Sequence, residues 1–174
     1  MSTPAPSSAA LPIAHVLLRV LIVANWAMMA VILALLVAPH REWIMTSLRL
    51  APSAEADRLV MGLRAIAVLG LVAIPFNHAV LQRLLAMVET VRAGDPFVAA
   101  NASRLHVIAW ALLGLQVLSV VIGAIARANS TPAHPLKIDA GFSINGWLAV
   151  LLTFLLARVF AEGARMREDL EGTV

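Results

Sequence analysis

The chain has 174 residues, of which 61% are hydrophobic and only 13% are charged, and it contains no Cys. Soluble proteins carry about 25% charged residues, so too few polar groups remain here to cover a folded soluble surface. The balance excludes a disordered chain, which needs the opposite composition, and the lack of Cys excludes disulfides and thiolate metal sites. The net charge of +3 comes from scattered cations, with no basic run of the kind that binds nucleic acid. The composition therefore predicts a membrane protein and argues against a soluble enzyme.

Four apolar stretches are each close to the length of about 20 residues that a helix needs to cross a bilayer. They cover approximately residues 16–37, 63–81, 107–126 and 146–161. We therefore predict an all-α polytopic membrane protein with four transmembrane helices in an antiparallel bundle. The first stretch follows a segment without Lys or Arg and precedes no small-x-small site, so we expect it to be retained and not cleaved as a signal peptide.

Three regions follow from this layout. Residues 1–14 are expected to form a mobile tail, because their Ser- and Pro-rich start lacks apolar bulk. Residues 15–162 form the transmembrane domain. Residues 163–174 form a charged helical tail.

The first linker and the second helix carry further local signals. Residues 42–50 mix apolar and charged side chains and predict a short amphipathic helix at the membrane interface. Pro52 suits a first helical turn, and Glu55 and Asp57 are favourable near a helix N-terminus. The second helix is expected to run on to about Arg92, giving over 30 residues or roughly 45 Å.

The run Gly94-Asp95-Pro96 predicts a turn between the second and third helices. Gly94 can adopt the left-handed conformation that ends a helix. Asp95 is expected to cap the next helix, with Pro96 in its first turn. The fourth helix should continue to about Leu170 because its charges recur at helical spacing. Both the second and the fourth helices therefore extend beyond the bilayer.

Charge placement gives an orientation. Four spans put both termini on one side, and the loop between the second and third spans is flanked by more Arg than the loop between the third and fourth. Because Lys and Arg are enriched on the cytoplasmic side, both termini are expected in the cytoplasm. On that side we expect the two helical extensions to pack around Phe97, with their Arg and acidic side chains facing one another.

Polar residues inside the spans are the candidates for a site. Pro75 should kink the second helix, and Asn77 and His78 follow it, so the three predict either a polar pocket or a packing feature. Arg158, near a span end, is expected to reach the headgroups. The remaining interior polar groups are expected to form hydrogen bonds between helices, and they are Asn25, Gln116, Ser119 and Thr153.

Catalytic and cofactor patterns are weak. The sequence has no P-loop, nucleophile elbow, HExxH or dinucleotide turn. A b-type haem between His78 and His106 is a lesser alternative, because the two lie about 9 Å apart in height on the expected hairpin. We therefore expect no catalytic residue, no metal and no cofactor.

Two motifs carry a family resemblance. The first is Gly94-Asp95-Pro96-Phe97 followed by Asn101 and Arg104-Leu105. The second is the tail, with Val159-Phe160, Gly163, Arg167-Glu168-Asp169 and Glu171-Gly172-Thr173-Val174. From about Val16 onward the chain resembles the bacterial family DUF2975. The resemblance implies a small four-helix protein of the bacterial inner membrane without an assigned activity. Members are often encoded beside a small helix-turn-helix transcription regulator, which implies a membrane-bound regulatory partner.

The leading expectation is a non-enzymatic membrane protein that binds or senses a partner through its cytoplasmic face. The candidate residues of that face are Gly94, Asp95, Pro96, Phe97, Asn101, Arg104, Arg165, Arg167, Glu168 and Asp169. The alternative is a small-molecule or ion-handling protein that uses Pro75, Asn77 and His78. The expected partners are the lipid bilayer and a cytoplasmic protein, with a second copy of the chain as a further candidate and no direct nucleic-acid binding.

Overall fold

The computed structural model describes residues 10–37, 46, 54–95, 97–130, 136 and 138–171, and within these residues the chain is helical with no strand. The four helices are α1 (Ala10–Val37), α3 (Ala54–Arg92), α4 (Ala99–Asn129) and α5 (Ile144–Glu171). Each is long and apolar enough to cross a membrane. The predictions of an all-α chain and of four apolar spans are thereby confirmed. The predicted interface helix at 42–50 lies outside the described residues, apart from the helical Thr46.

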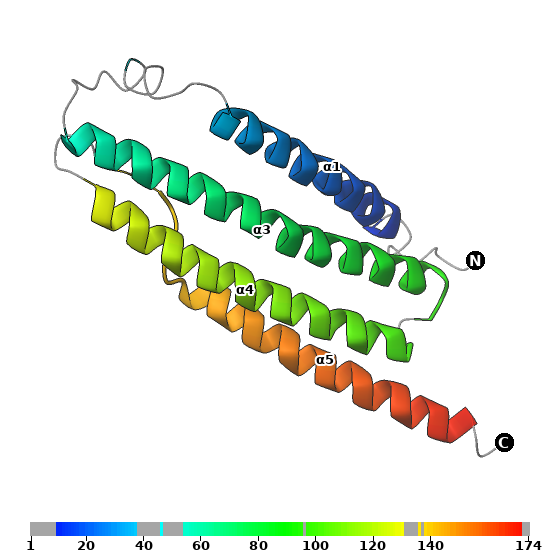
Figure 1. The fold of residues 1–174 in the computed structure, drawn as a ribbon. Helices are drawn as coiled ribbons and strands as arrows, with labels where there is room; N and C mark the ends of the chain where they lie inside the picture. Colours follow the sequence, from blue (N-terminus) through cyan, green and yellow to red (C-terminus); the bar gives the residue numbers. More distant parts are fainter. Residues whose placement is uncertain are drawn as a thin grey trace.

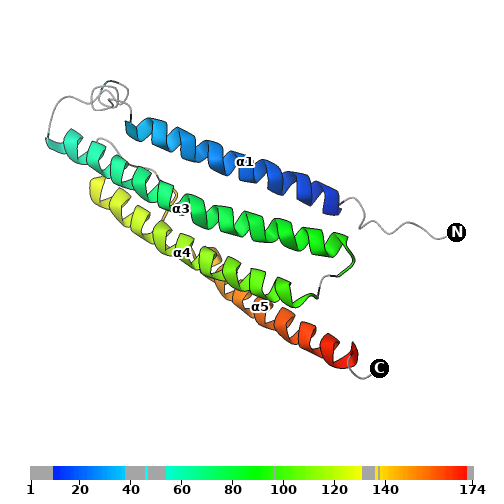
Figure 2. The ribbon, with the colours of Figure 1, turned by 45° about the vertical axis from the view of Figure 1, so that its right-hand side comes forward.

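The helices pack in chain order, α1 on α3, α3 on α4 and α4 on α5 (Figures 1 and 2). Contacts between them fix the register. Asn25 Nδ2 donates to the carbonyl of Ile74 at 3.3 Å, and the rings of His106 and Phe154 lie 5.6 Å apart. The helices α1 and α5 form the two outer members of the row.

The ends of α3 and α5 lie close to the predicted ones, whereas α1 begins earlier than predicted. α1 begins at Ala10, so its first turns fall within the range expected for the tail, and Pro12 is tolerated there because a first-turn N–H needs no partner. α3 has 39 residues, carries Glu55 and Asp57 in its first turn and continues through Pro75. At 1.5 Å per residue it is roughly 58 Å long, longer than a bilayer core of about 30 Å.

Buried apolar residues occur at both ends of the α3–α4 pair, and one packed cluster lies toward the turn between these helices. Leu105, Ile108 and Ala157 form its centre, and side chains of α3, α4 and α5 pack around them: Val80, Leu84, Met87, Leu112 and Phe160. By contrast, none of the α1 residues is buried, although α1 is the most apolar of the four helices. Lipid chains satisfy such a surface, because hydrocarbon is as apolar as the side chains themselves.

α5 begins part-way along α4, and the non-helical residues 138–143 lie along the rest of α4 (Figures 1 and 2). Ser119 Oγ accepts a hydrogen bond from the Gly141 N–H at 3.1 Å and lies 3.2 Å from the Gly141 carbonyl. Gln116 Nε2 donates to the Ser143 carbonyl at 3.3 Å. The prediction of hydrogen bonds between helices is thus right for Asn25 but wrong for Gln116 and Ser119, which bond to the segment preceding α5.

Thr153 also departs from that prediction. Its hydroxyl donates to the carbonyl of Ala149 at 2.7 Å, within α5 itself. A Thr in a helix commonly bonds to the carbonyl four residues earlier when no neighbouring helix offers an acceptor.

Gly123 allows the 138–143 segment to approach α4. A Cβ at Gly123 would lie 2.5 Å from the Ala140 carbonyl oxygen, whereas a Cβ at Gly70, also in a helix, would meet only Ile32 at 3.5 Å. Gly123→Ala should therefore destabilise the fold by about 1–3 kcal/mol through overpacking. Gly70→Ala should be neutral or stabilising by about 0.5–1 kcal/mol, since Ala is the better helix former.

Thermal unfolding of both variants in the same detergent measures the difference. A melting temperature for Gly123→Ala equal to or above that of Gly70→Ala would show that the segment does not pack on α4.

Candidate functional site

The turn after α3 is built as the sequence predicts at Gly94. Gly94 has a φ of 87°, a conformation that side chains with a Cβ rarely adopt. The Gly94 N–H donates to Val91 and the Asp95 N–H donates to Thr90, each at 3.1 Å. This pair of bonds is the Schellman motif, which satisfies carbonyls left open at a helix end.

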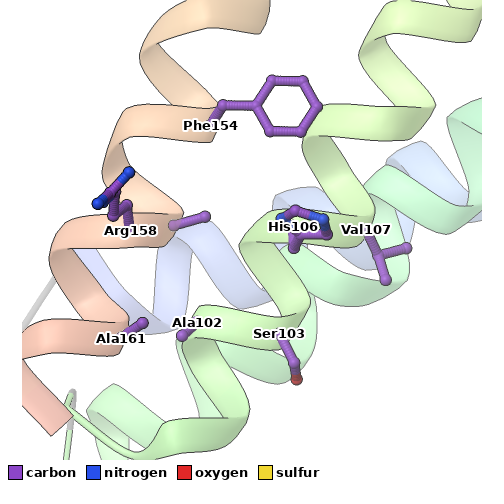
Figure 3. A pocket seen from close by; sticks show the side chains of 8 residues that line it. Ala102, Ser103, His106, Val107, Phe154, Arg158 and Ala161 are labelled. Carbon is purple, nitrogen blue, oxygen red and sulfur yellow. The ribbon is translucent and has the colours of Figure 1, made fainter. Parts of the chain in front are cut away.

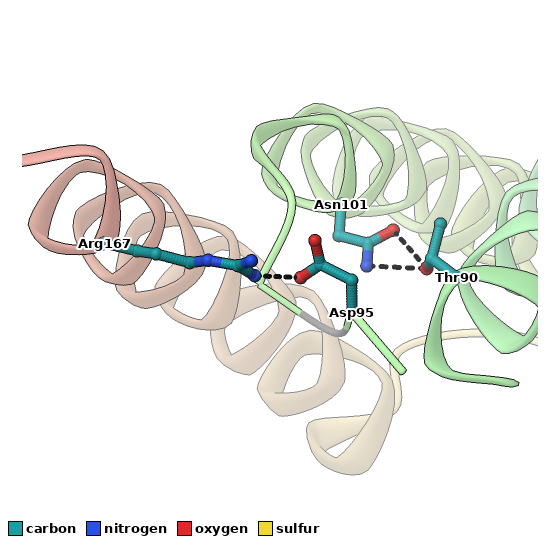
Figure 4. Close-up of polar contacts among 4 residues, drawn as sticks. All are labelled: Thr90, Asp95, Asn101 and Arg167. Carbon is teal, nitrogen blue, oxygen red and sulfur yellow. Dashed lines mark hydrogen bonds and ion pairs between the residues drawn. The ribbon is translucent and has the colours of Figure 1, made fainter. Parts of the chain in front are cut away.

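Asp95 has a different role from the predicted one. The residue preceding α4 is Val98, and α4 has no side-chain cap. The Asp95 carboxylate instead forms an ion pair with Arg167 of α5 (Figure 4). The prediction that Asp95 caps the third helix is therefore wrong, because α4 begins four residues later and α5 offers a guanidinium across the turn.

Phe97 packs against α5, although it keeps 47% of its surface exposed. Its ring centroid lies 5.4 Å from that of Phe160. Gly163 leaves room for it, since a Cβ there would lie 3.4 Å from the ring. The predicted contact of Phe97 with α5 exists, and it joins the turn to α5. The expected packing of the two helical extensions against each other is not found among the described residues, because α5 packs on α4.

Asn101 is fully buried, with none of its surface exposed. Its Nδ2 donates to Thr90 Oγ1 at 2.9 Å (Figure 4), and its Oδ1 accepts from Arg104 Nη1 at 2.8 Å. Arg104 Nη1 also donates to the Ala86 carbonyl at 3.1 Å. The network ties the first turn of α4 to the last turns of α3. Arg104 thus binds an amide and a backbone carbonyl, and the expected pairing with a carboxylate is wrong for this residue.

Thr90 is the residue of this network that was not predicted from the sequence. Its hydroxyl donates to the Met87 carbonyl at 2.8 Å, which leaves its oxygen free to accept from Asn101. A signal was present in the sequence. Thr90 and Asn101 lie at equal distances on either side of the turn, so an antiparallel hairpin brings them to the same height.

The C-terminal end of α5 lies beside the turn between α3 and α4 and carries exposed charged side chains. Arg165 pairs with Glu162 at 3.9 Å, and both side chains are largely exposed. Met166 is 56% exposed, and Glu168 and Asp169 are exposed as well. We call the turn face the exposed surface formed by Gly94, Asp95, Phe97 and residues 165–169. Pro96 lies outside the described residues.

The Pro75 region contains a separate hollow of about 400 Å³. Pro75 and His78 line it together with Trp26 of α1, whose ring is 5.1 Å from the imidazole. The Nδ1 atom of His78 is buried and has no hydrogen-bond partner in the described part of the chain. Asn77 is not among the lining residues. The structure thus brings two of the three predicted pocket residues together and adds Trp26.

A larger hollow of about 690 Å³ lies between α4 and α5 and is lined by His106 from α4 and Phe154 from α5 (Figure 3). Arg158 lines it from α5. His106 Nε2 accepts a hydrogen bond from Trp110 Nε1 at 3.1 Å. His106 therefore faces α5 while His78 faces α1, so the structure does not bring the two histidines of the haem alternative together. Within the described ranges, no group of three His, Cys, Asp or Glu side chains could hold a metal ion.

The buried network should matter more for stability than the exposed contacts beside it. Asn101→Ala leaves the Thr90 and Arg104 groups without their partner, so it should cost about 1–3 kcal/mol. Arg167→Ala removes an ion pair whose side chains are 45% and 37% exposed, and such pairs contribute only about 0–1 kcal/mol. Thermal unfolding of both variants in one detergent checks this order, and an equal or larger loss for Arg167→Ala would contradict it.

Comparisons with known proteins give one match. A family model described as a protein of unknown function, DUF2975, matches residues 4–174. No curated protein and no solved structure matches the chain. The matched range includes all four helices, the Gly94 turn and the charged end of α5. The chain belongs to the DUF2975 family.

Proposed function

We propose that this chain is a non-enzymatic integral membrane protein that binds a cytoplasmic protein through the turn face. Its four helices would cross the bacterial inner membrane as an antiparallel bundle, with both termini in the cytoplasm. The exposed apolar surface of α1 and α5 supports the membrane location, because large apolar patches on a soluble monomer are rare. The ends of α3 and α5 would then extend into the cytoplasm on the side of the turn.

The observation that carries the partner proposal is the exposure of apolar side chains among charges on the turn face. Phe97 and Met166 are 47% and 56% exposed, and Arg165 lies next to Met166 in the sequence. Aromatic residues, Met and Arg are enriched at protein interfaces. An exposed Phe and Met on an aqueous surface are therefore candidates for contact with another protein.

The turn face is also held in place before any partner arrives. The ion pair of Asp95 with Arg167 and the contact of Phe97 with Phe160 fix the turn to α5. A preorganised surface avoids part of the entropy loss on binding. The small helix-turn-helix regulator implied by the family resemblance is the candidate partner.

A photoreactive amino acid in place of Met166 tests this proposal in living cells. We expect a specific cross-linked adduct with a cytoplasmic protein at this position. The matched control is Ile144, which is 75% exposed at the other end of the same helix and should give no such adduct. An absence of adducts at Met166, or the same adduct at both positions, would contradict the proposal.

The orientation has its own test. Reporter fusions after Val174 and near Pro132 should report cytoplasmic and periplasmic locations, respectively, because an even number of spans returns the chain to its starting side. A periplasmic reporter after Val174 would reverse the orientation and place the turn face outside the cytoplasm.

A second candidate function rests on the hollow beside Pro75. The unpartnered Nδ1 atom of His78 beside Trp26 supports binding of an amphipathic small molecule from the membrane. Native mass spectrometry of the purified protein tests this, with a bound small molecule expected on the wild type and lost from His78→Leu. An identical mass profile for the two proteins would count against this candidate.

A further inference from the structure

The non-helical residues 138–143 lie at the height of the membrane-spanning parts of their neighbours. They contact α4 from Gly123 to Gln116, inside the apolar stretch 107–126. A Cβ on Gly114, two residues before Gln116, would touch the ring of Phe76. Two residues before Phe76, the carbonyl of Ile74 accepts a hydrogen bond from Asn25 in the middle of α1. The contact of Gln116 with Ser143 is therefore level with the middle of α1.

Part of the backbone in this segment is satisfied by α4 and by local bonds. The Ala140 N–H donates to the Ile138 carbonyl at 2.9 Å, and the Gly141 N–H donates to Ser119. The Ser143 carbonyl accepts from Gln116 and from the Trp147 N–H. The N–H groups of Asp139 and Phe142, however, have no hydrogen-bond partner among the residues that the structure describes.

Unpaired backbone groups cannot face lipid. Each polar group buried in hydrocarbon without a partner costs roughly 2–7 kcal/mol, and irregular backbone at membrane depth occurs only where it is covered by protein or lines a water-filled cavity. Here the segment is not covered, because Phe142 is 72% exposed and the Asp139 side chain is exposed. Water must therefore reach it.

We infer that an aqueous recess enters the membrane from the side opposite the α3–α4 turn and ends at Gln116 and the start of α5. Residues 138–143 form one wall of it, and α4 forms another. The recess admits water and small hydrophilic solutes to about the middle of the bilayer. The inference rests on the membrane-spanning arrangement proposed above, and it is independent of the partner.

Single-Cys labelling tests the recess, and the absence of Cys from the natural chain means that each variant carries one thiol. The test variant is Asn145→Cys, since Asn145 is exposed and adjoins Gly146, which lies against Gln116. The control is Val117→Cys, which is 49% exposed and follows Gln116 directly on α4. The probe is a charged, membrane-impermeant maleimide applied to the full-length protein in oriented vesicles.

We expect Asn145→Cys to react more than about tenfold faster than Val117→Cys, because only a hydrated thiol forms the reactive thiolate. Phe142→Cys should behave as Asn145→Cys does and provides a second position. If both Asn145→Cys and Val117→Cys react, this height lies outside the bilayer and there is no recess. If neither reacts, lipid or protein covers the segment, which also overturns the inference.

The side from which the probe reacts separates the recess from the proposed orientation. Reaction of Asn145→Cys from the periplasmic side supports both. Reaction from the cytoplasmic side, with Val117→Cys still protected, supports the recess and overturns the placement of the termini.

Discussion

The buried amide of Asn101 is the interaction on which the rest of this arrangement depends. Among the described residues it is the one polar side chain with no exposed surface, so its hydrogen-bonding groups have to find partners within the protein. Thr90 from α3 and Arg104 from α4 satisfy it. Because these bonds fix the height of α4 against α3, they also fix where the Gly94 turn emerges. Asp95 and Phe97 can then reach α5.

The apolar cluster packs against the same α3–α4 hairpin. Its apolar centre lies just beyond the Asn101 network, where side chains of α3, α4 and α5 meet. α1 is attached to this unit through α3, by Asn25 and by the contact of Trp26 with His78. The polar contacts of α1 therefore coincide with the hollow beside Pro75, and a change there would act on the attachment of α1 as well as on the hollow.

Features with a local cause could be predicted from the sequence. The span positions follow from apolar length, and the end of α3 follows from the freedom of Gly94 to take a positive φ. The two motifs also identified the family. Among contacts between distant residues, those of Asn25 and Phe97 could be anticipated in kind, but most partners could not be predicted. Asp95 has equal local reasons to cap α4 or to pair with a cation, and only the position of α5 selects Arg167.

The polar residues of α4 illustrate the same limit. Gln116 and Ser119 are expected to bond to something, because polar groups in a span need partners. The hydrophobic periodicity of the sequence does not reveal where α5 starts. It therefore cannot show that the partners of Gln116 and Ser119 are non-helical backbone groups. Gly123 indicates the close approach of this segment once the structure is known, since a Cβ at this position would meet the Ala140 carbonyl.

The late start of α5 also has a consequence for the surrounding lipid. The apolar part of α5, residues 146–161, is roughly 24 Å long at helical rise, shorter than the hydrocarbon thickness of about 30 Å. The apolar part of α1, residues 16–37, is roughly 33 Å long by the same measure and covers the full hydrocarbon thickness. Lipid beside α5 therefore meets a shorter hydrophobic surface than lipid beside α1, and the recess inferred at the start of α5 takes the place of the missing length. The short side therefore requires an adjustment of the bilayer or of the flanking side chains, whereas the long side does not.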